Sequence, residues 1–81
     1  MPAPYRTDEI ATALMAVARR ADLPLHSVEI SANDAAHSWV IRLRERDGEE
    51  HRLNFPFASA RGIYTPAEIA DHITRGTWPF G

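Results

Sequence analysis

The sequence predicts a small α+β domain, in which a three-stranded antiparallel sheet carries two helices on one face in the order α-β-β-β-α. Three patterns predict this fold: apolar residues at helical spacing near the N-terminus, three later segments of alternating polarity, and a capping motif before a last apolar stripe. A chain of 81 residues has room for a single domain. We place that domain at residues 7–76, after an extended segment at 1–6 and before an apolar tail at 77–81.

The first helix is expected over residues 8–21. Thr7 is a typical N-cap residue, because its hydroxyl can accept a hydrogen bond from a free amide of the first turn. Acidic residues follow Thr7 and arginines occupy the last turn, which suits the helix dipole. Pro24 ends the helical region. The expected apolar stripe consists of Ile10, Ala13, Leu14, Val17 and Ala21.

Three strands are expected at residues 25–31, 38–45 and 51–57, since apolar and polar side chains alternate along each of them. Such alternation is typical of a sheet with one buried and one solvated face. The core expected from the strands and both helices comprises Leu14, Val17, Trp39, Ile41, Leu53, Phe55, Ile69 and Ile73.

The loop between the second and third strands decides which residues lie opposite each other. A two-residue turn would set Leu43 opposite Arg52 and mix the two faces of the sheet. A three-residue loop at 46–48 sets Leu43 beside His51 and keeps the apolar face intact, whereas a five-residue loop brings two arginines opposite each other. We expect the three-residue loop, with Gly48 in the left-handed conformation.

The second helix has the clearest local signal in the chain. Residues 65–68, Thr-Pro-Ala-Glu, form a capping box with proline at the first helical position. Gly76 is a suitable C-terminal cap. The buried stripe between these two signals is expected to be Ile69, Ala70 and Ile73.

This element order resembles that of double-stranded-RNA-binding domains, and the resemblance covers most of the chain. That family contacts RNA through a Gly-Pro-x-His loop between its first two strands and through a lysine-rich start of its second helix. The corresponding loop here is Ala32–His37, which has the histidine without Gly-Pro, and the second helix opens with the neutral-to-acidic residues 65–68. Recognition of an A-form backbone needs positive charge at both places. The resemblance therefore implies the topology, while the residues that would contact RNA differ.

Composition excludes several kinds of catalytic site. The chain has no cysteine and no lysine, so a thiolate nucleophile, a Cys-ligated metal and a Schiff-base lysine are excluded. The serines lie in no G-x-S-x-G motif. The histidines lack metal-ligand spacing, and in one plausible register His26 and His51 lie roughly 9–10 Å apart, too far to share a metal. His37 and His72 are expected to be solvated. We therefore expect no enzyme activity, no metal and no cofactor.

Two surfaces are candidates for partner binding. Three arginines should project from neighbouring strands among Ser27, Glu29 and Glu50, and arginine is well suited to bind carboxylate or phosphate. This surface is either a solvated, salt-bridged face or a docking surface. The apolar tail either folds over the core or exposes aromatic anchors. The candidate residues are Arg42, Arg44, Arg52, Glu29, Trp78 and Phe80.

These observations favour a non-enzymatic protein-binding domain. Small size and missing catalytic motifs are typical of stoichiometric inhibitors or adaptors encoded by phages and mobile elements, such as anti-CRISPR proteins, which block a nucleic-acid-handling protein sterically. The alternatives are a nucleic-acid-binding module that uses the arginine face, and a small housekeeping domain. A net charge of −2 argues against a generally basic nucleic-acid binder. Without a leader or membrane-span pattern, we expect a cytoplasmic monomer or homodimer.

Overall fold

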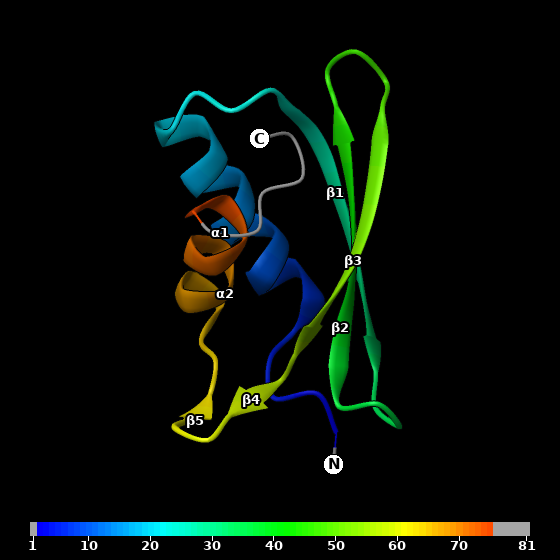
Figure 1. Ribbon diagram of the computed structural model, residues 1–81, viewed down its shortest axis with the longest axis vertical. Helices are drawn as coiled ribbons and strands as arrows, with labels where there is room; N and C mark the ends of the chain where they lie inside the picture. The colour runs from blue at the N-terminus through cyan, green and yellow to red at the C-terminus, as the bar shows by residue number, and fades with distance from the viewer. Residues whose placement is uncertain (1, 76–81) are drawn as a thin grey trace.

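The computed structural model describes residues 2–75. Its elements are α1 (Thr7–Arg20), β1 (Leu25–Asn33), β2 (Ser38–Glu45), β3 (Glu50–Pro56), β4 (Ala58–Ser59), β5 (Gly62–Ile63) and α2 (Pro66–Arg75). The three long strands form an antiparallel sheet in the order β1-β2-β3, and both helices lie on the same face of it (Figure 1). The predicted α+β class and element order are confirmed. No helix within residues 2–75 is long and apolar enough to cross a membrane.

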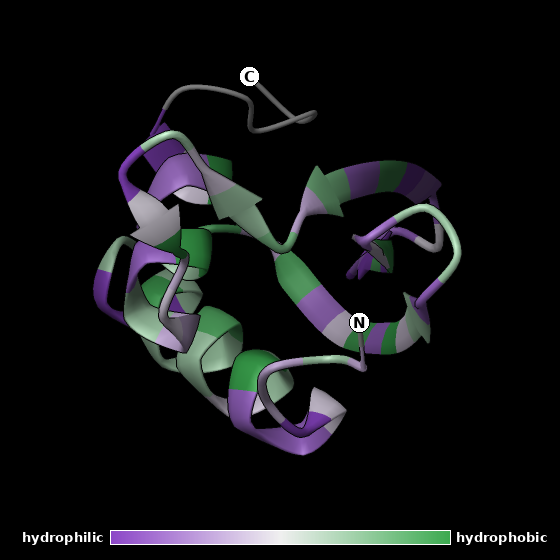
Figure 2. Ribbon diagram, turned by 90° about the horizontal axis from the view of Figure 1, so that it is seen from below, coloured by the Kyte–Doolittle hydropathy of each residue, from purple (hydrophilic) through white to green (hydrophobic). Residues whose placement is uncertain are grey.

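The core lies between the helices and the sheet. Helix α1 packs against both α2 and β1, and residue hydropathy alternates along the strands (Figure 2). This alternation turns one side of each strand toward the helices. The buried apolar residues are Ile10, Leu14, Ala18, Leu25, Trp39, Ile41, Leu43, Phe57, Ile69, Ala70 and Ile73.

Helix α1 begins one residue earlier than predicted. Thr7 is its first helical residue and Arg6 is the N-cap, so the predicted N-cap at Thr7 is wrong. The Glu9 carboxylate accepts a hydrogen bond of 2.9 Å from the Arg6 backbone N–H, and the Arg6 guanidinium donates to Asp8 at 3.1 Å. The Glu9 carboxylate thus satisfies a free backbone N–H at the cap, so the Thr7 hydroxyl is not required as a capping acceptor.

The buried stripe of α1 also differs from the predicted one. Ile10, Leu14 and Ala18 are buried, whereas Val17 is half-buried. Ala21 was expected in the stripe but is the exposed C-cap, because the helix ends at Arg20. The buried residues of α1 are therefore four positions apart, in a row that is inclined to the helix axis.

The β2–β3 hairpin has the predicted three-residue loop. Leu43 lies opposite His51, and Gly48 has a φ of +94°, which favours glycine. The Glu45 N–H donates to the Glu49 carbonyl at 2.8 Å, and the Gly48 N–H donates to the Glu45 carbonyl at 2.9 Å. The requirement for an intact apolar face therefore predicted the register correctly.

Strand β1 is longer than predicted and is irregular at its start. It continues to Asn33, and its pairing with β2 shifts between Leu25 and Ser27. The hairpin turn at residues 34–37 sets the register and places Val28 opposite Leu43. His26 is the extra residue of the bulge and has no partner in the register. The register in which His26 and His51 lie in one cross-strand row is therefore wrong.

The chain after β3 departs most from the sequence prediction. Strand β3 runs from Glu50 to Pro56 rather than over 51–57, and the residues between β3 and α2 contain the short hairpin β4–β5, which no pattern in the sequence predicted. The Phe57 N–H donates to the His37 carbonyl at 2.8 Å, and the Tyr64 N–H donates to the Phe57 carbonyl at 3.0 Å. The first bond continues the β2–β3 register by one residue on each strand beyond the pair of Ser38 and Pro56. Phe57 therefore stays on the same side as Phe55, and its side chain is buried in the core.

Three residues of the expected core are only half-buried: Val17, Leu53 and Phe55. Leu53 and Phe55 belong to β3, which is an edge strand of the three-stranded sheet. An edge strand has a neighbour on one side only, so its side chains are partly open to solvent even on the apolar face. The Phe55 ring instead contacts Tyr64, with ring centroids 4.9 Å apart.

Helix α2 has the predicted capping box. The Glu68 N–H donates to the Thr65 hydroxyl at 3.2 Å, and the Thr65 N–H donates to the Glu68 carboxylate at 3.0 Å. The pKa of Glu68 is lowered, first by the hydrogen bond from the Thr65 backbone and then by that from its side chain. Ile69, Ala70 and Ile73 are all buried, as predicted. The predicted cap at Gly76 lies outside the described residues.

The Thr65→Ala variant should lower the free energy of unfolding by about 0.5–2 kcal/mol, because it removes one capping acceptor. Chemical denaturation followed by circular dichroism measures this loss. Thr12→Ala is the matched control, since Thr12 is exposed within α1 and alanine has the higher helix propensity. Equal stabilities of the two variants would show that the cap contributes nothing.

Candidate functional site

Within residues 2–75, no helix or strand covers the face of the sheet that points away from both helices (Figure 1). The residues on this face alternate with buried Trp39, Ile41 and Leu43 of β2, so they share one side of the sheet. Cross-strand pairing arranges them in three rows: Ser27–Arg44–Glu50, Glu29–Arg42–Arg52 and Ser31–Val40–Asn54. We call these nine residues the open sheet face.

Ion pairs join all three strands across the open sheet face. The Arg42 guanidinium lies 3.1 Å from the Glu29 carboxylate and 3.5 Å from that of Glu50. Arg44 lies 2.6 Å from Glu50. The two arginine side chains are about half exposed, at 51% and 52%. Exposed pairs of this kind contribute only about 0–1 kcal/mol to stability, so their main consequence is to orient the guanidinium groups.

In the Arg44–Glu50 pair, each side chain stabilises the charged form of the other. The pKa of Glu50 is lowered, first by the hydrogen bond from Arg44 and then by its positive charge. The same contacts raise the pKa of Arg44. Since the folded-state pKa of Glu50 is lowered, its stabilising contribution is present above the ordinary carboxyl pKa and is lost as the pH falls through the lowered value. The pair is therefore fully charged at neutral pH.

Arg52 differs from its two neighbours. It lies directly opposite Arg42 in the register, and like charges at opposite positions repel. Within residues 2–75, Arg52 makes no ion pair, and its side chain is exposed. The open sheet face thus holds three arginines against two glutamates, and its surplus positive charge lies at the β3 edge.

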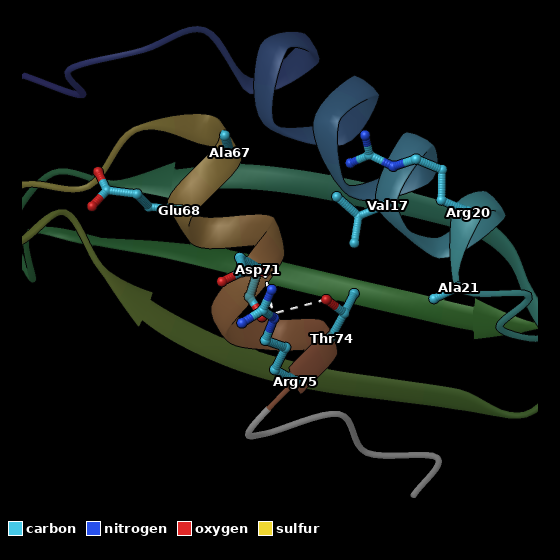
Figure 3. A pocket seen from close by; sticks show the side chains of 8 residues that line it. All are labelled: Val17, Arg20, Ala21, Ala67, Glu68, Asp71, Thr74 and Arg75. Atoms are coloured by element: carbon cyan, nitrogen blue, oxygen red, sulfur yellow. Dashed lines mark hydrogen bonds and ion pairs between the residues drawn. The ribbon is translucent and has the colours of Figure 1, made fainter.

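A hollow between the two helices is another candidate site (Figure 3). It has a volume of about 640 Å³ and is lined by Val17, Arg20, Ala21, Ala67, Glu68, Asp71, Thr74 and Arg75. Arg75 pairs with Asp71 at 2.8 Å, and the Thr74 hydroxyl donates to the Ala70 carbonyl at 2.9 Å. On the α2 side of the hollow, the side chains of Asp71, Thr74 and Arg75 therefore bond to groups of α2 itself and are not directed at a ligand.

The histidines predicted to be solvated have aromatic neighbours. His37 is exposed in the turn after β1, and its ring stacks at 6.5 Å on that of Phe57. His72 is exposed on α2, with its ring 5.3 Å from Tyr64 and 5.9 Å from Phe55. The short β4–β5 hairpin brings Tyr64 to this place, which residue spacing alone did not predict.

The structure also assembles a group that spacing analysis missed. Ligand atoms of Glu45, Glu49 and His51 lie within 4.8 Å of one another at the tip of the β2–β3 hairpin. The signal was the spacing Glu-x₃-Glu-x-His around a three-residue loop, which places all three residues on one face of a hairpin. The sequence prediction considered the spacing of the histidines alone, whereas this set combines one histidine with two carboxylates across a hairpin turn.

The open sheet face brings together four of the six predicted binding residues: Arg42, Arg44, Arg52 and Glu29. The other two, Trp78 and Phe80, lie outside the described residues. Comparison with protein-family models, curated proteins and solved structures finds no match to this chain. The likeness to double-stranded-RNA-binding domains therefore stays a resemblance in element order.

Proposed function

We propose that this chain is a non-enzymatic protein-binding domain whose open sheet face docks onto an acidic surface of a partner protein. The observation that carries this proposal is an uncovered sheet face with three exposed arginines on two neighbouring strands. A guanidinium group presents a planar set of donors that fits a carboxylate in a bidentate manner. A row of such groups on a sheet suits a surface that bears several carboxylates.

The glutamates of the open sheet face support this role. Glu29 and Glu50 hold the guanidinium groups of Arg42 and Arg44 in place before a partner arrives. Ordering long side chains at an interface costs about 0.5–1.5 kcal/mol each, and prior ordering reduces that cost. Arg52 has no ion-pair partner within residues 2–75, so it is the first group available to a partner carboxylate.

The biological role that we propose is that of a small stoichiometric inhibitor or adaptor of the phage and mobile-element type, such as an anti-CRISPR protein. Occupying a nucleic-acid-handling protein sterically requires a rigid docking surface and no catalytic group. A rigid sheet backed by two helices meets that requirement. Direct nucleic-acid binding is less favoured, because the chain has a net charge of −2 whereas nucleic-acid binders carry an extended basic patch.

Replacement of Arg42, Arg44 and Arg52 by glutamate should weaken partner capture at least tenfold, which corresponds to about 1.4 kcal/mol. A quantitative pull-down from a lysate of the source organism measures capture, and thermal melts check folding. The matched control reverses three exposed arginines elsewhere, Arg19, Arg20 and Arg61, and changes the net charge equally. A triple Arg→Gln variant removes the positive charges without creating new repulsion, in case the glutamate variant does not fold.

Two outcomes would contradict the proposal. Capture by the triple variant at wild-type affinity would show that the open sheet face is only a solvated surface, and would favour Trp78 and Phe80 as anchors. Tight binding of free duplex that weakens steeply with salt would indicate a nucleic-acid binder, because the slope reports the phosphates contacted. Little duplex binding at physiological salt, combined with retained protein capture, is the expected result.

A further inference from the structure

The tip of the β2–β3 hairpin gathers two carboxylates and an imidazole. Glu45 ends β2, Glu49 directly precedes β3, and His51 is the second residue of β3. One ligand atom from each residue lies within 4.8 Å of the other two. None of the three residues belongs to the nine that form the open sheet face.

The backbone of the loop keeps the three residues in register. Glu45 and Glu49 face each other through the 2.8 Å hydrogen bond from the Glu45 N–H to the Glu49 carbonyl. The Glu49 N–H also donates to the Asp47 carboxylate at 2.9 Å, which supports the turn. His51 lies two residues beyond Glu49, so their side chains project to the same side of the strand. The ligand set is therefore presented by a hydrogen-bonded hairpin rather than by a loose loop.

Two side chains of the cluster are largely buried, which raises the cost of an uncompensated charge there. The Glu45 side chain is only 12% exposed, and that of His51 is 22% exposed. On its other side Glu45 pairs in the register with Leu25, which is buried. A carboxylate that is largely removed from water needs a compensating charge or donor. The Glu45 carboxylate has one such partner, the His51 imidazole, whose Nε2 lies 3.0 Å from Oε2 of Glu45. The facing carboxylate of Glu49 adds repulsion, since like charges at opposite positions are destabilising. A single imidazole cannot offset two carboxylates, whereas a divalent cation bound by all three groups neutralises both.

The ligand types indicate which cation fits. An imidazole nitrogen with carboxylate oxygens is a ligand set that Zn²⁺ accepts, whereas Mg²⁺ and Ca²⁺ prefer oxygen alone. The Nε2 atom of His51 lies 3.0 Å from Oε2 of Glu45. Two ligands of a tetrahedral zinc ion with bonds of about 2.0–2.1 Å lie roughly 3.3 Å apart, so this pair needs little movement. Glu49 is exposed, and its side chain can turn toward the ion.

We propose that Glu45, Glu49 and His51 form a Zn²⁺ site at the hairpin tip, with the fourth coordination position open to water. The ion links the end of β2 to the start of β3 and neutralises the two facing carboxylates. Because it binds the folded hairpin and finds no preformed site in the unfolded chain, it stabilises the native state. This inference is independent of the proposed docking role of the open sheet face.

The test is titration of the chain with ZnCl₂ by calorimetry and by thermal melting, with MgCl₂ as the comparison salt. Zinc should bind at one ion per chain and raise the melting temperature, and magnesium should do neither. His51→Gln and Glu45→Gln should each weaken zinc binding at least about tenfold, since even indirect disturbance of a metal site costs about that much. The matched control is His26→Gln, because His26 is an exposed histidine at the β1 bulge, and it should bind zinc like the wild type.

A second measurement uses the unaltered chain and so does not depend on how the variants fold. Co²⁺ added to ¹⁵N-labelled protein should broaden the amide signals of residues 45–51 before any others. Broadening centred on His37 or His72 would overturn the assignment. Absence of saturable zinc binding, or wild-type zinc affinity in a folded His51→Gln variant, would overturn it as well.

Discussion

The Ile41→Ala variant is expected to lose about 2–5 kcal/mol of unfolding free energy. Ile41 lies on the central strand, is fully buried, and sits between Ile30 and Leu53 in the register. Truncation removes apolar contacts and leaves a cavity that neighbouring strands and helices on three sides cannot readily fill. Since small domains have roughly 5–15 kcal/mol of stability in total, this loss is a large part of it. Urea denaturation measures the change.

Val40→Ala is the control for Ile41→Ala. Val40 is the next residue of the same strand, but it is half-buried on the open sheet face. Its truncation should cost less than half as much, because solvent already reaches part of the side chain and no closed cavity forms. Equal losses in the two variants would contradict the assignment of the buried face.

The Phe57→Ala variant is expected to cost about 3–5 kcal/mol, as large as any single truncation in this core. Phe57 is 1% exposed, and its ring meets that of Trp39 edge-on with centroids 4.9 Å apart. Such aromatic pairs add about 0.5–1.5 kcal/mol beyond the area that they bury. The truncation removes both contributions from the centre of the domain.

Phe55→Ala is the informative comparison for Phe57→Ala. Sequence alternation places both rings on one apolar face, but Phe55 is half-buried on the edge strand. Its truncation should therefore cost clearly less by the same urea denaturation. A cost for Phe55→Ala that equals or exceeds that for Phe57→Ala would show that the core is centred on β3 rather than on β2.

The sequence alone determined several local features of this chain. The capping box of α2 depends on residues three apart, and the hairpin loop on the need to keep Leu43 and Ile41 on one face. The alternation of polar and apolar residues likewise places Arg42, Arg44 and Arg52 on one face, because side chains in a strand repeat every two residues. All these features are decided within one helix turn or one hairpin, so local chemistry is sufficient to predict them.

Burial and cross-strand register depend on residues distant in sequence, so only the tertiary structure decided them. The half-burial of Phe55 follows from the edge position of β3, whereas the Phe57 ring packs against Trp39 and is buried. The β1–β2 register puts Val28 in the row with Leu43 and leaves His26 unpaired at the β1 bulge. The gathering of Glu45 and His51 with Glu49 needed the register together with burial against the end of the core. Alternation predicts which side of the strand a residue faces. Burial depends on which other elements cover that side, and the cover is determined only when helices and strands pack together.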